Sequence, residues 1–116
     1  MLVELQALDK LRIPKWIKEI LRDFIVKVKN SLDCIEVYLF GGYARVNWLY
    51  DSDIDLIVVS PLFKNLNMSE RYVLIRRMLP NIVSVELLLY TPEEFEKMKR
   101  KSIVIQDAEE YWVKLL

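Results

Sequence analysis

Histidine is absent from the 116-residue chain. That absence excludes the usual side-chain general base, the commonest zinc ligand and every Ser–His or Cys–His catalytic pair. The single cysteine, Cys34, cannot form an intramolecular disulfide, which fits a reducing compartment. If the chain is an enzyme, its chemistry must use carboxylates, lysine, arginine and backbone amides, with or without a hard metal ion.

An excess of charge is missing too. Lys and Arg total 17, as do Asp and Glu, so the formal net charge is zero. A broad nucleic-acid-binding surface normally shows as a basic excess, so we do not expect a nucleic-acid partner. No segment approaches the roughly 20 apolar residues that cross a bilayer, and charged residues interrupt residues 1–15, unlike a secretory signal. We therefore expect a cytoplasmic protein that does not enter a membrane.

The composition is that of a chain with a substantial core. Hydrophobic residues make up 53% of the sequence, enough to form a core without disulfides or a structural metal. A length of 116 residues is near the common domain size, and no repeat or Gly/Ser-rich linker divides the chain. We expect one domain over residues 1–116.

Apolar residues recur at three- and four-residue steps in several segments, which is typical of helices. A proline or a capping residue stands at the start of three of these segments. The expected helices are residues 2–12, 14–31, 67–79 and 91–101, with a further helix over the second half of 103–116. Within 67–79 the expected inward-facing residues are Tyr72, Ile75, Met78 and Leu79.

Runs of β-branched and aromatic residues predict strands at 34–40, 53–59 and 82–90. The middle strand is almost wholly apolar after Asp55, as expected for a strand covered on both faces. Residues 43–47 form a short helix or turn. This order indicates an α/β or α+β domain with a central sheet.

Both glycines of the chain, Gly41 and Gly42, stand side by side where the first predicted strand ends. Glycine there permits positive φ and lets the backbone approach a ligand closely. The amides of such a turn suit a phosphate. Arg45 lies one turn further along, where its guanidinium could contact phosphates.

Acidic residues open the next strand. Asp53 and Asp55 project from the same face because side chains alternate along a strand. Two such carboxylates repel each other unless a cation lies between them, and they form the oxygen-rich pocket that Mg²⁺ prefers. Glu86 lies among apolar residues of the last strand, where an unpaired carboxylate is costly to bury. If the two strands are adjacent, the three carboxylates could hold one or two Mg²⁺ ions for phosphoryl or nucleotidyl transfer.

A longer motif runs through these residues. Residues 41–59, GGYARVNWLYDSDIDLIVV, resemble the signature G-[SG]-x-[AS]-R-G-x(n)-[ST]-D-[IVL]-D-[LF] of the polymerase-β-like nucleotidyltransferases. The resemblance is closest to the small prokaryotic group called minimal nucleotidyltransferases and extends over most of the chain. Residues 85–98, VELLLYTPEEFEKM, resemble the family's third-acid strand and the helix after it.

The resemblance implies the polymerase-β-like fold, with a small mixed central sheet flanked by helices. Members of the family use Mg²⁺ and a nucleoside triphosphate, usually ATP, to transfer a nucleoside monophosphate to an acceptor hydroxyl. Many minimal members are encoded beside a helical HEPN-type toxin, and some add AMP to a tyrosine of that toxin. The resemblance thus implies ATP as substrate, Mg²⁺ as cofactor and a HEPN-type toxin as partner.

The resemblance also assigns roles to individual residues. By analogy the third acid helps to deprotonate the acceptor hydroxyl as well as to bind metal. The matched positions are Gly41, Gly42, Arg45 and Ser52 at the nucleotide, and Asp53, Asp55 and Glu86 at the metal.

Three positions depart from the family pattern. Gly42 replaces the commoner serine and so removes a hydroxyl that would bind phosphate, and Val46 replaces the glycine that usually follows the arginine. Glu86 replaces the usual aspartate, and its extra methylene could shift the carboxylate by about 1 Å, a displacement that can cost on the order of a hundredfold in rate.

Some residues have a second interpretation. Glu86 could lie at a sheet edge or pair with a lysine, and Arg45 could be one partner of a surface salt bridge. Trp48, Leu49 and Tyr50 could pack on the domain or contact a partner protein.

Three hypotheses of function follow. The first is Mg²⁺-dependent transfer of AMP from ATP to a hydroxyl of a partner HEPN-type toxin. The second is a catalytically weak antitoxin that neutralises its toxin by occlusion. The third keeps the chemistry but uses an RNA end or a small molecule as acceptor. The sequence leaves open the acceptor, the nucleotide preference, the number of metal ions and the oligomeric state.

Overall fold

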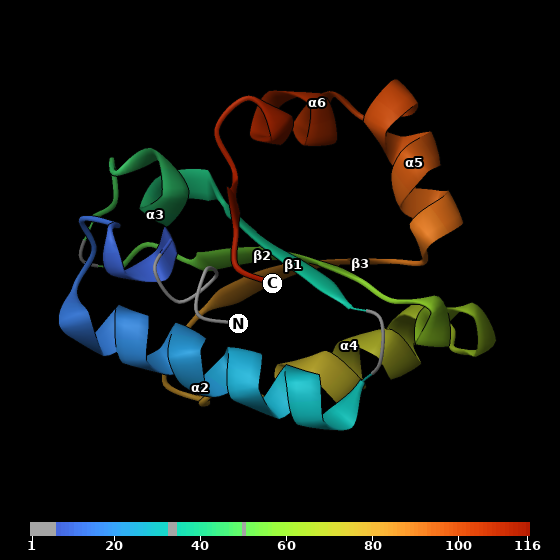
Figure 1. Ribbon diagram of the computed structural model, residues 1–116, viewed down its shortest axis with the longest axis horizontal. Helices are drawn as coiled ribbons and strands as arrows, with labels where there is room; N and C mark the ends of the chain where they lie inside the picture. The colour runs from blue at the N-terminus through green and yellow to red at the C-terminus, as the bar shows by residue number, and fades with distance from the viewer. Residues whose placement is uncertain (1–6, 33–34, 50) are drawn as a thin grey trace.

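A four-stranded mixed sheet lies at the centre of the part of the protein that the structure describes (Figure 1). The computed structural model describes residues 7–32, 35–49 and 51–116. The strands lie in the order β3–β2–β1–β4. Their bounds are β1 Glu36–Phe40, β2 Ile54–Val59, β3 Val85–Tyr90 and β4 Val113–Lys114. The helices are α2 Lys15–Ser31, α3 Gly41–Arg45, α4 Met68–Arg76, α5 Pro92–Lys101 and α6 Ile103–Glu109, with a 3₁₀ helix η1 at Pro61–Asn65.

The strand directions are mixed. β1 pairs antiparallel with both β2 and β4, whereas β2 and β3 are parallel. A parallel neighbour requires a crossover, and η1 and α4 supply it between β2 and β3. The architecture is the α+β arrangement of a small mixed sheet flanked by helices, as the sequence predicted.

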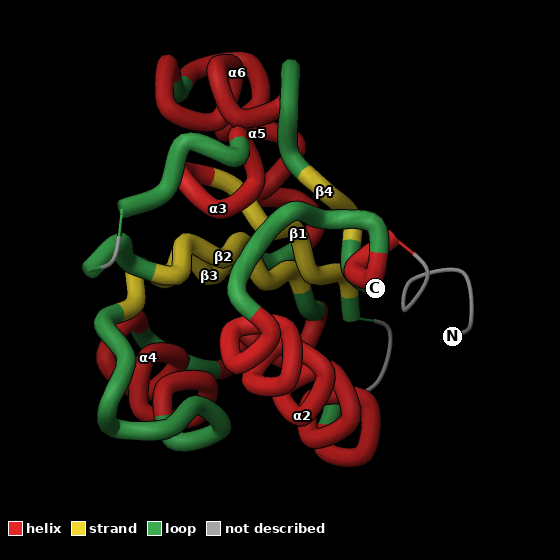
Figure 2. Tube along the Cα trace, turned by 90° about the vertical axis from the view of Figure 1, so that its left-hand side faces the viewer, coloured by secondary structure: helices red, strands yellow, loops and turns green. Residues whose placement is uncertain are grey.

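Helices cover both faces of the sheet (Figures 1 and 2). α2 and α4 lie on one face, and α5 and α6 lie on the other. Since side chains alternate along each strand, the sheet contributes to two separate cores. Leu39, Leu56 and Val58 pack with α2, while Tyr38 and Ile57 pack with α5 and α6. None of the helices in the described ranges is both long and apolar enough to span a membrane.

Capping residues fix where the later helices begin. The Asn67 side chain accepts a hydrogen bond from the Glu70 N–H, and Glu70 accepts one from the Asn67 N–H, each at 2.9 Å. Thr91 and Glu94 form the same reciprocal pair at the start of α5. Each pair satisfies two backbone donors that a helix start otherwise leaves free.

The C-terminal segment differs from the sequence prediction. Helix α6 occupies the first half of 103–116, not the second, because the Ser102 side chain caps it by accepting a hydrogen bond from the Ile105 N–H at 3.2 Å. The second half contains β4, in which Val113 pairs with Leu39 of β1. This strand gives the edge of β1 a partner, a tertiary contact that overrides local helix preference.

Smaller differences lie elsewhere. Ile75, Met78 and Leu79 are buried as predicted, but Tyr72 is exposed, and the predicted inward position of its ring is wrong. β3 begins at Val85, not at residue 82, because residues 81–83 form a turn. Residues 7–9 are helical, in keeping with part of the predicted helix 2–12; residues 1–6 and Cys34 of the first predicted strand lie outside the described residues.

A buried arginine joins the elements around β3. Arg71 is buried, with 5% of its surface exposed. Its Nε donates to the Phe63 and Leu66 carbonyls at 3.1 and 3.0 Å. Its Nη1 donates to the Leu89 carbonyl at 3.0 Å and to Glu94 Oε1 at 2.7 Å. The hydrogen bond from Arg71 lowers the pKa of Glu94. One side chain therefore connects η1, α4, β3 and α5.

We predict that Arg71→Met lowers the free energy of unfolding by about 3 kcal/mol, because it leaves buried carbonyls without their donor. Urea unfolding followed by circular dichroism measures the loss. Lys27→Met is the control, since Lys27 and Asp23 form an exposed i,i+4 pair at 2.9 Å whose loss should cost about 0.5 kcal/mol or less. Equal losses in the two variants would contradict a structural role for Arg71.

Candidate active site

The end of β1 and the starts of β2 and β3 lie side by side at one end of the sheet. β1 ends at Phe40, which pairs with Asp55 near the start of β2. Asp55 in turn pairs with Glu86 near the start of β3. β1 continues directly into α3 at Gly41. The topology therefore brings the glycine turn beside the acidic residues, which lie far apart in the sequence.

The Gly41 backbone lies against the Asp55 carboxylate. A Cβ atom added at Gly41 would overlap with Asp55 Oδ2 and lie 2.7 Å from Asp55 Cγ. Gly41 also has φ of +71°, a conformation that side chains disfavour. Only glycine fits both conditions, and its missing Cβ leaves the room that the Asp55 carboxylate occupies.

Position 42 is different. A Cβ at Gly42 would meet Asn47 Oδ1 at 3.5 Å, Trp48 Cα at 3.6 Å and Ser52 Oγ at 3.7 Å, all ordinary van der Waals contacts. The Ser52 hydroxyl itself accepts a hydrogen bond from the Leu49 N–H at 2.6 Å and closes the turn before the acidic strand. Gly42 and Ser52 are thus neighbours, and the site has room for a side chain at position 42.

Asp55 and Glu86 form a carboxyl pair. Burial, the charge of Glu86, a hydrogen bond with Glu86 and the charge of Asp53, in that order of size, together raise the pKa of Asp55 to about 7 from its ordinary 3.8. Asp53 lies just outside β2 and is exposed. Among the described residues, no three carboxylate, cysteine or histidine side chains are gathered closely enough to hold a metal ion as they stand. Asp55 and Glu86 thus lie close enough for each carboxyl group to act on the other.

Arg45 points toward α6. Its guanidinium lies over the Tyr111 ring, 4.4 Å from the centroid, and its Nη1 is 3.7 Å from Asp107 Oδ2. The Tyr111 hydroxyl accepts a hydrogen bond from the Gly41 N–H at 3.1 Å. The structure thus contains the salt bridge that was one of the two interpretations of Arg45, and it adds Tyr111 to the glycine turn.

The sequence profile that describes the nucleotidyltransferase domain matches residues 15–111, which is most of the chain. The chain belongs to the nucleotidyltransferase domain family.

Solved structures show the same fold. One is a protein of Sulfolobus solfataricus described provisionally as a nucleotidyltransferase, with 22% identity, a TM-score of 0.57, and coverage of 81% of this chain and 78% of that one. Another is a toxin–antitoxin structure with AMP-PNP, with 21% identity, a TM-score of 0.57, and coverage of 80% of this chain and 70% of that one. No curated protein gave a significant match.

Two further residues shape the turn after α3 in this nucleotidyltransferase domain. Val46 has φ of 60° and ψ of 34°, a left-handed conformation that is strained for a β-branched residue, and the position is where the family motif has glycine. Trp48 stacks on Tyr43 with ring centroids 6.1 Å apart, and its Nε1 donates to the Arg12 carbonyl at 2.9 Å. Trp48 therefore packs on the domain, Leu49 is exposed, and Tyr50 lies outside the described residues.

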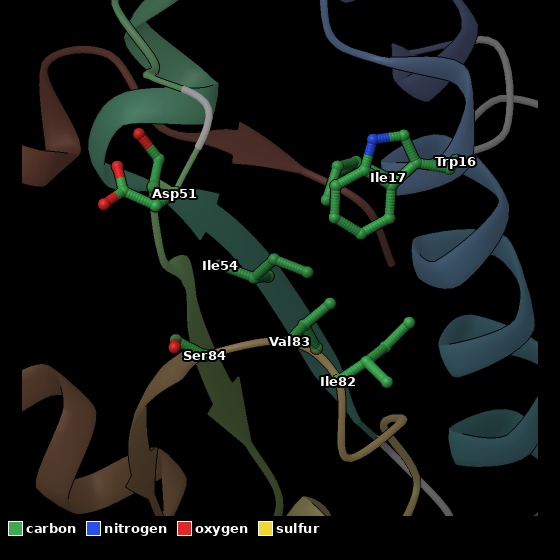
Figure 3. Close-up of a pocket in the computed structure, with 8 residues that line it drawn as sticks. Trp16, Ile17, Asp51, Ile54, Ile82, Val83 and Ser84 are labelled. Atoms are coloured by element: carbon green, nitrogen blue, oxygen red, sulfur yellow. The ribbon is translucent and has the colours of Figure 1, made fainter.

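A pocket of about 250 Å³ lies beside the strand ends (Figure 3). Trp16 and Ile17 form one wall, from the first turn of α2, and Ile82 and Val83 form another. Ile54 also lines this pocket, and its side chain points to the opposite face of β2 from that of Asp55. Asp51 and Ser52, directly before the acidic strand, also line the pocket.

Tyr111 and Asp107 were not identified from the sequence. Their contacts with Gly41 and Arg45 depend on the pairing of β4 with β1, which the prediction of a terminal helix excluded. The one local signal was the run of aromatic and β-branched residues at 111–113, which favours a strand.

We predict that Gly41→Ala lowers the free energy of unfolding by about 2 kcal/mol or more, because Cβ would displace the Asp55 carboxylate and φ is positive. Gly42→Ala is the matched control, and we expect it to change stability by about 1 kcal/mol or less, since the added methyl group meets only ordinary contacts. Chemical unfolding of both variants compares the two sites. Equal destabilisation would contradict the close approach at Gly41.

The raised pKa of Asp55 predicts a pH-dependent stability. Because the folded-state pKa of about 7 lies above the ordinary value of 3.8, the folded protein binds this proton more tightly than the unfolded chain. The contribution to stability is full below pH 3.8 and is lost as pH rises through about 7. We expect the metal-free protein to unfold at lower urea concentration at about pH 8 than at about pH 5, and Mg²⁺ to reverse much of that loss.

Asp55→Asn should flatten this pH dependence, because the amide does not titrate. Asp51→Asn is the control, since Asp51 is an exposed acid two residues before Asp53. If the wild type and Asp55→Asn lost stability equally between the two pH values, Asp55 would not be the titrating group.

Proposed function

We propose that the protein is a Mg²⁺-dependent nucleotidyltransferase that moves AMP from ATP to a hydroxyl of a partner protein, a helical HEPN-type toxin. Membership of the nucleotidyltransferase domain family supports the reaction class. The observation that carries the proposal is the pairing of Asp55 with Glu86 on one face of the sheet, directly beside the Gly41 turn.

The carboxylates fit a hard divalent cation. Asp53, Asp55 and Glu86 offer only oxygen donors, which suit Mg²⁺. Asp55 and Glu86 are opposite each other in the β2–β3 pairing, and a bound cation would remove the repulsion between their carboxylates. Bound there, Mg²⁺ would neutralise charge on the triphosphate and on the attacking and leaving oxygens.

The residues around the carboxylates have distinct proposed roles. Glu86, more exposed than Asp55, accepts the proton of the acceptor hydroxyl as its oxygen bonds to the α-phosphorus of ATP, and the bond from that phosphorus to the bridging oxygen breaks to release pyrophosphate. The Gly42 backbone amide and the Ser52 hydroxyl face the phosphates, and Gly41 lets the turn approach them closely while its own N–H donates to the Tyr111 hydroxyl. Arg45 can reach them only if its contacts with Asp107 and Tyr111 rearrange.

The partner is proposed from two observations. The sequence resembles the minimal nucleotidyltransferases, and one structure of the same fold is a toxin–antitoxin complex with AMP-PNP. The acceptor hydroxyl would then arrive on the partner.

We predict that the protein, incubated with Mg²⁺, α-³²P-labelled ATP and the product of the adjacent gene, transfers label to that product. Asp53→Asn should lower the rate on the order of a hundredfold or more, because loss of a metal ligand removes several kcal/mol of charge stabilisation. Asp51→Asn is the matched control and should keep the wild-type rate.

Absence of label transfer, or equal transfer by wild type and Asp53→Asn, would contradict the catalytic proposal. Binding of the partner without any Mg²⁺–ATP binding in calorimetry would instead support neutralisation by occlusion. Label on an RNA end or a small molecule would keep the chemistry and change the acceptor.

A further inference from the structure

The Gly41 turn depends on a hydrogen bond from outside its own segment. The Gly41 N–H donates to the Tyr111 hydroxyl at 3.1 Å, across 70 positions of the sequence. The same glycine has positive φ and lies against the Asp55 carboxylate. Because glycine has no Cβ, the peptide before it can rotate at low cost unless a partner holds its N–H.

The register of the sheet places Tyr111 at this position. β4 pairs antiparallel with β1, with Val113 opposite Leu39. In an antiparallel pair, a step forward along one strand matches a step back along the other. Gly41, two residues after Leu39, is therefore opposite Tyr111, two residues before Val113. The meeting of these residues is therefore a consequence of the β1–β4 pairing.

The Tyr111 ring is itself held in place. It packs against both core clusters, and the Arg45 guanidinium covers it at 4.4 Å. Arg45 is in turn within 3.7 Å of Asp107, one turn earlier in α6. The Tyr111 N–H donates to the Ala108 carbonyl at 3.0 Å. Such a ring is a fixed support for the hydroxyl, unlike a side chain on a mobile loop.

We propose that Tyr111 is a positioning residue of the transfer site: its hydroxyl holds the Gly41 peptide and so keeps the glycine backbone against the Asp55 carboxylate. This inference rests on the proposed function. It adds a role for the C-terminal segment, which contributes no carboxylate to the site.

The first test uses the Gly41 amide directly. The chain has only two glycines, so their amide signals in a ¹H–¹⁵N spectrum form a small and assignable set. In Tyr111→Phe we expect the Gly41 amide to exchange with solvent about tenfold faster, the effect of one lost hydrogen bond, while the Gly42 amide is unchanged. Unchanged exchange at Gly41 would overturn the proposal.

The second test separates positioning from nucleotide binding. In the transfer assay, Tyr111→Phe should lower kcat by on the order of tenfold to a hundredfold, with KM for ATP within about threefold of wild type. A lower KM with a higher rate would overturn the proposal, because it would mean that the hydroxyl competes with the nucleotide for the Gly41 amide. A fall in thermal stability with kcat unchanged would also overturn it.

Tyr38→Phe is the matched control. Tyr38 is a buried tyrosine on the face of the sheet that α5 and α6 cover. Its hydroxyl donates to Glu36 Oε2 at 3.2 Å. Its loss removes one tyrosine hydrogen bond away from the Gly41 turn. We expect kcat and both glycine signals to stay at wild-type values in this variant.

A third measurement keeps the inference testable if the wild type transfers no label. Mn²⁺ titration, followed by paramagnetic broadening of the Gly41 signal, reports cation binding at Asp55 without any reaction. Tyr111→Phe should weaken Mn²⁺ binding by about tenfold, because the Asp55 carboxylate is less well placed. Equal Mn²⁺ affinity in wild type, Tyr111→Phe and Tyr38→Phe would overturn the role of Tyr111, whatever the outcome for catalysis.

Discussion

The Asp55 carboxylate lies directly against the backbone of Gly41, and the arrangement of the site depends on this contact. It requires glycine at position 41 and fixes the direction in which the chain leaves β1 and enters α3. It also leaves Asp55 half-buried, and this burial raises the pKa of its carboxyl group. The carboxyl pair with Glu86 follows from the same burial, since a desolvated acid shares a proton or binds a cation in preference to carrying an isolated charge.

Sheet topology brings the remaining groups to that contact. Antiparallel pairing of β1 with β2 places the end of one strand beside the start of the next. Parallel pairing of β2 with β3 places Glu86 opposite Asp55, and antiparallel pairing of β4 with β1 brings Tyr111 to Gly41. Asp55 and Glu86 lie in strands, and Gly41 and Tyr111 lie in segments next to strands, so the pairing brings all four to the same end of the sheet. A change of register by one residue would send these side chains to the opposite face.

The parts of this arrangement that the sequence predicted are those with local causes. Capping pairs at Asn67 and Thr91 marked two helix starts, and the apolar run after Asp55 marked β2. That Asp53 and Asp55 share one face stays a prediction, since Asp53 lies just outside β2. The proximity of Glu86 was predicted only on the condition that the two strands were neighbours. Tyr111 could not be predicted, because its position depends on an edge strand of two residues whose stability comes wholly from pairing with β1.

The two adjacent glycines show where prediction from local sequence ends. Gly41 and Gly42 look alike in the sequence, yet a side chain is excluded at one position and accommodated at the other. The difference lies in what packs above each residue, a carboxylate from β2 in one case and ordinary loop contacts in the other. A motif can therefore mark the turn, but only the tertiary structure shows which glycine the turn requires.

The site combines several unfavourable features, and the rest of the fold stabilises them. Val46 holds a left-handed conformation at a cost of about 1–2 kcal/mol, and like charges face each other at Asp55. Two cores, two reciprocal helix caps and the Arg71 network stabilise the fold against these costs. Since a cation would remove the carboxylate repulsion in the folded state alone, its binding and the order of the Gly41 turn must be thermodynamically coupled. The strand edge is thus the part of the molecule whose stability depends most on what is bound to it.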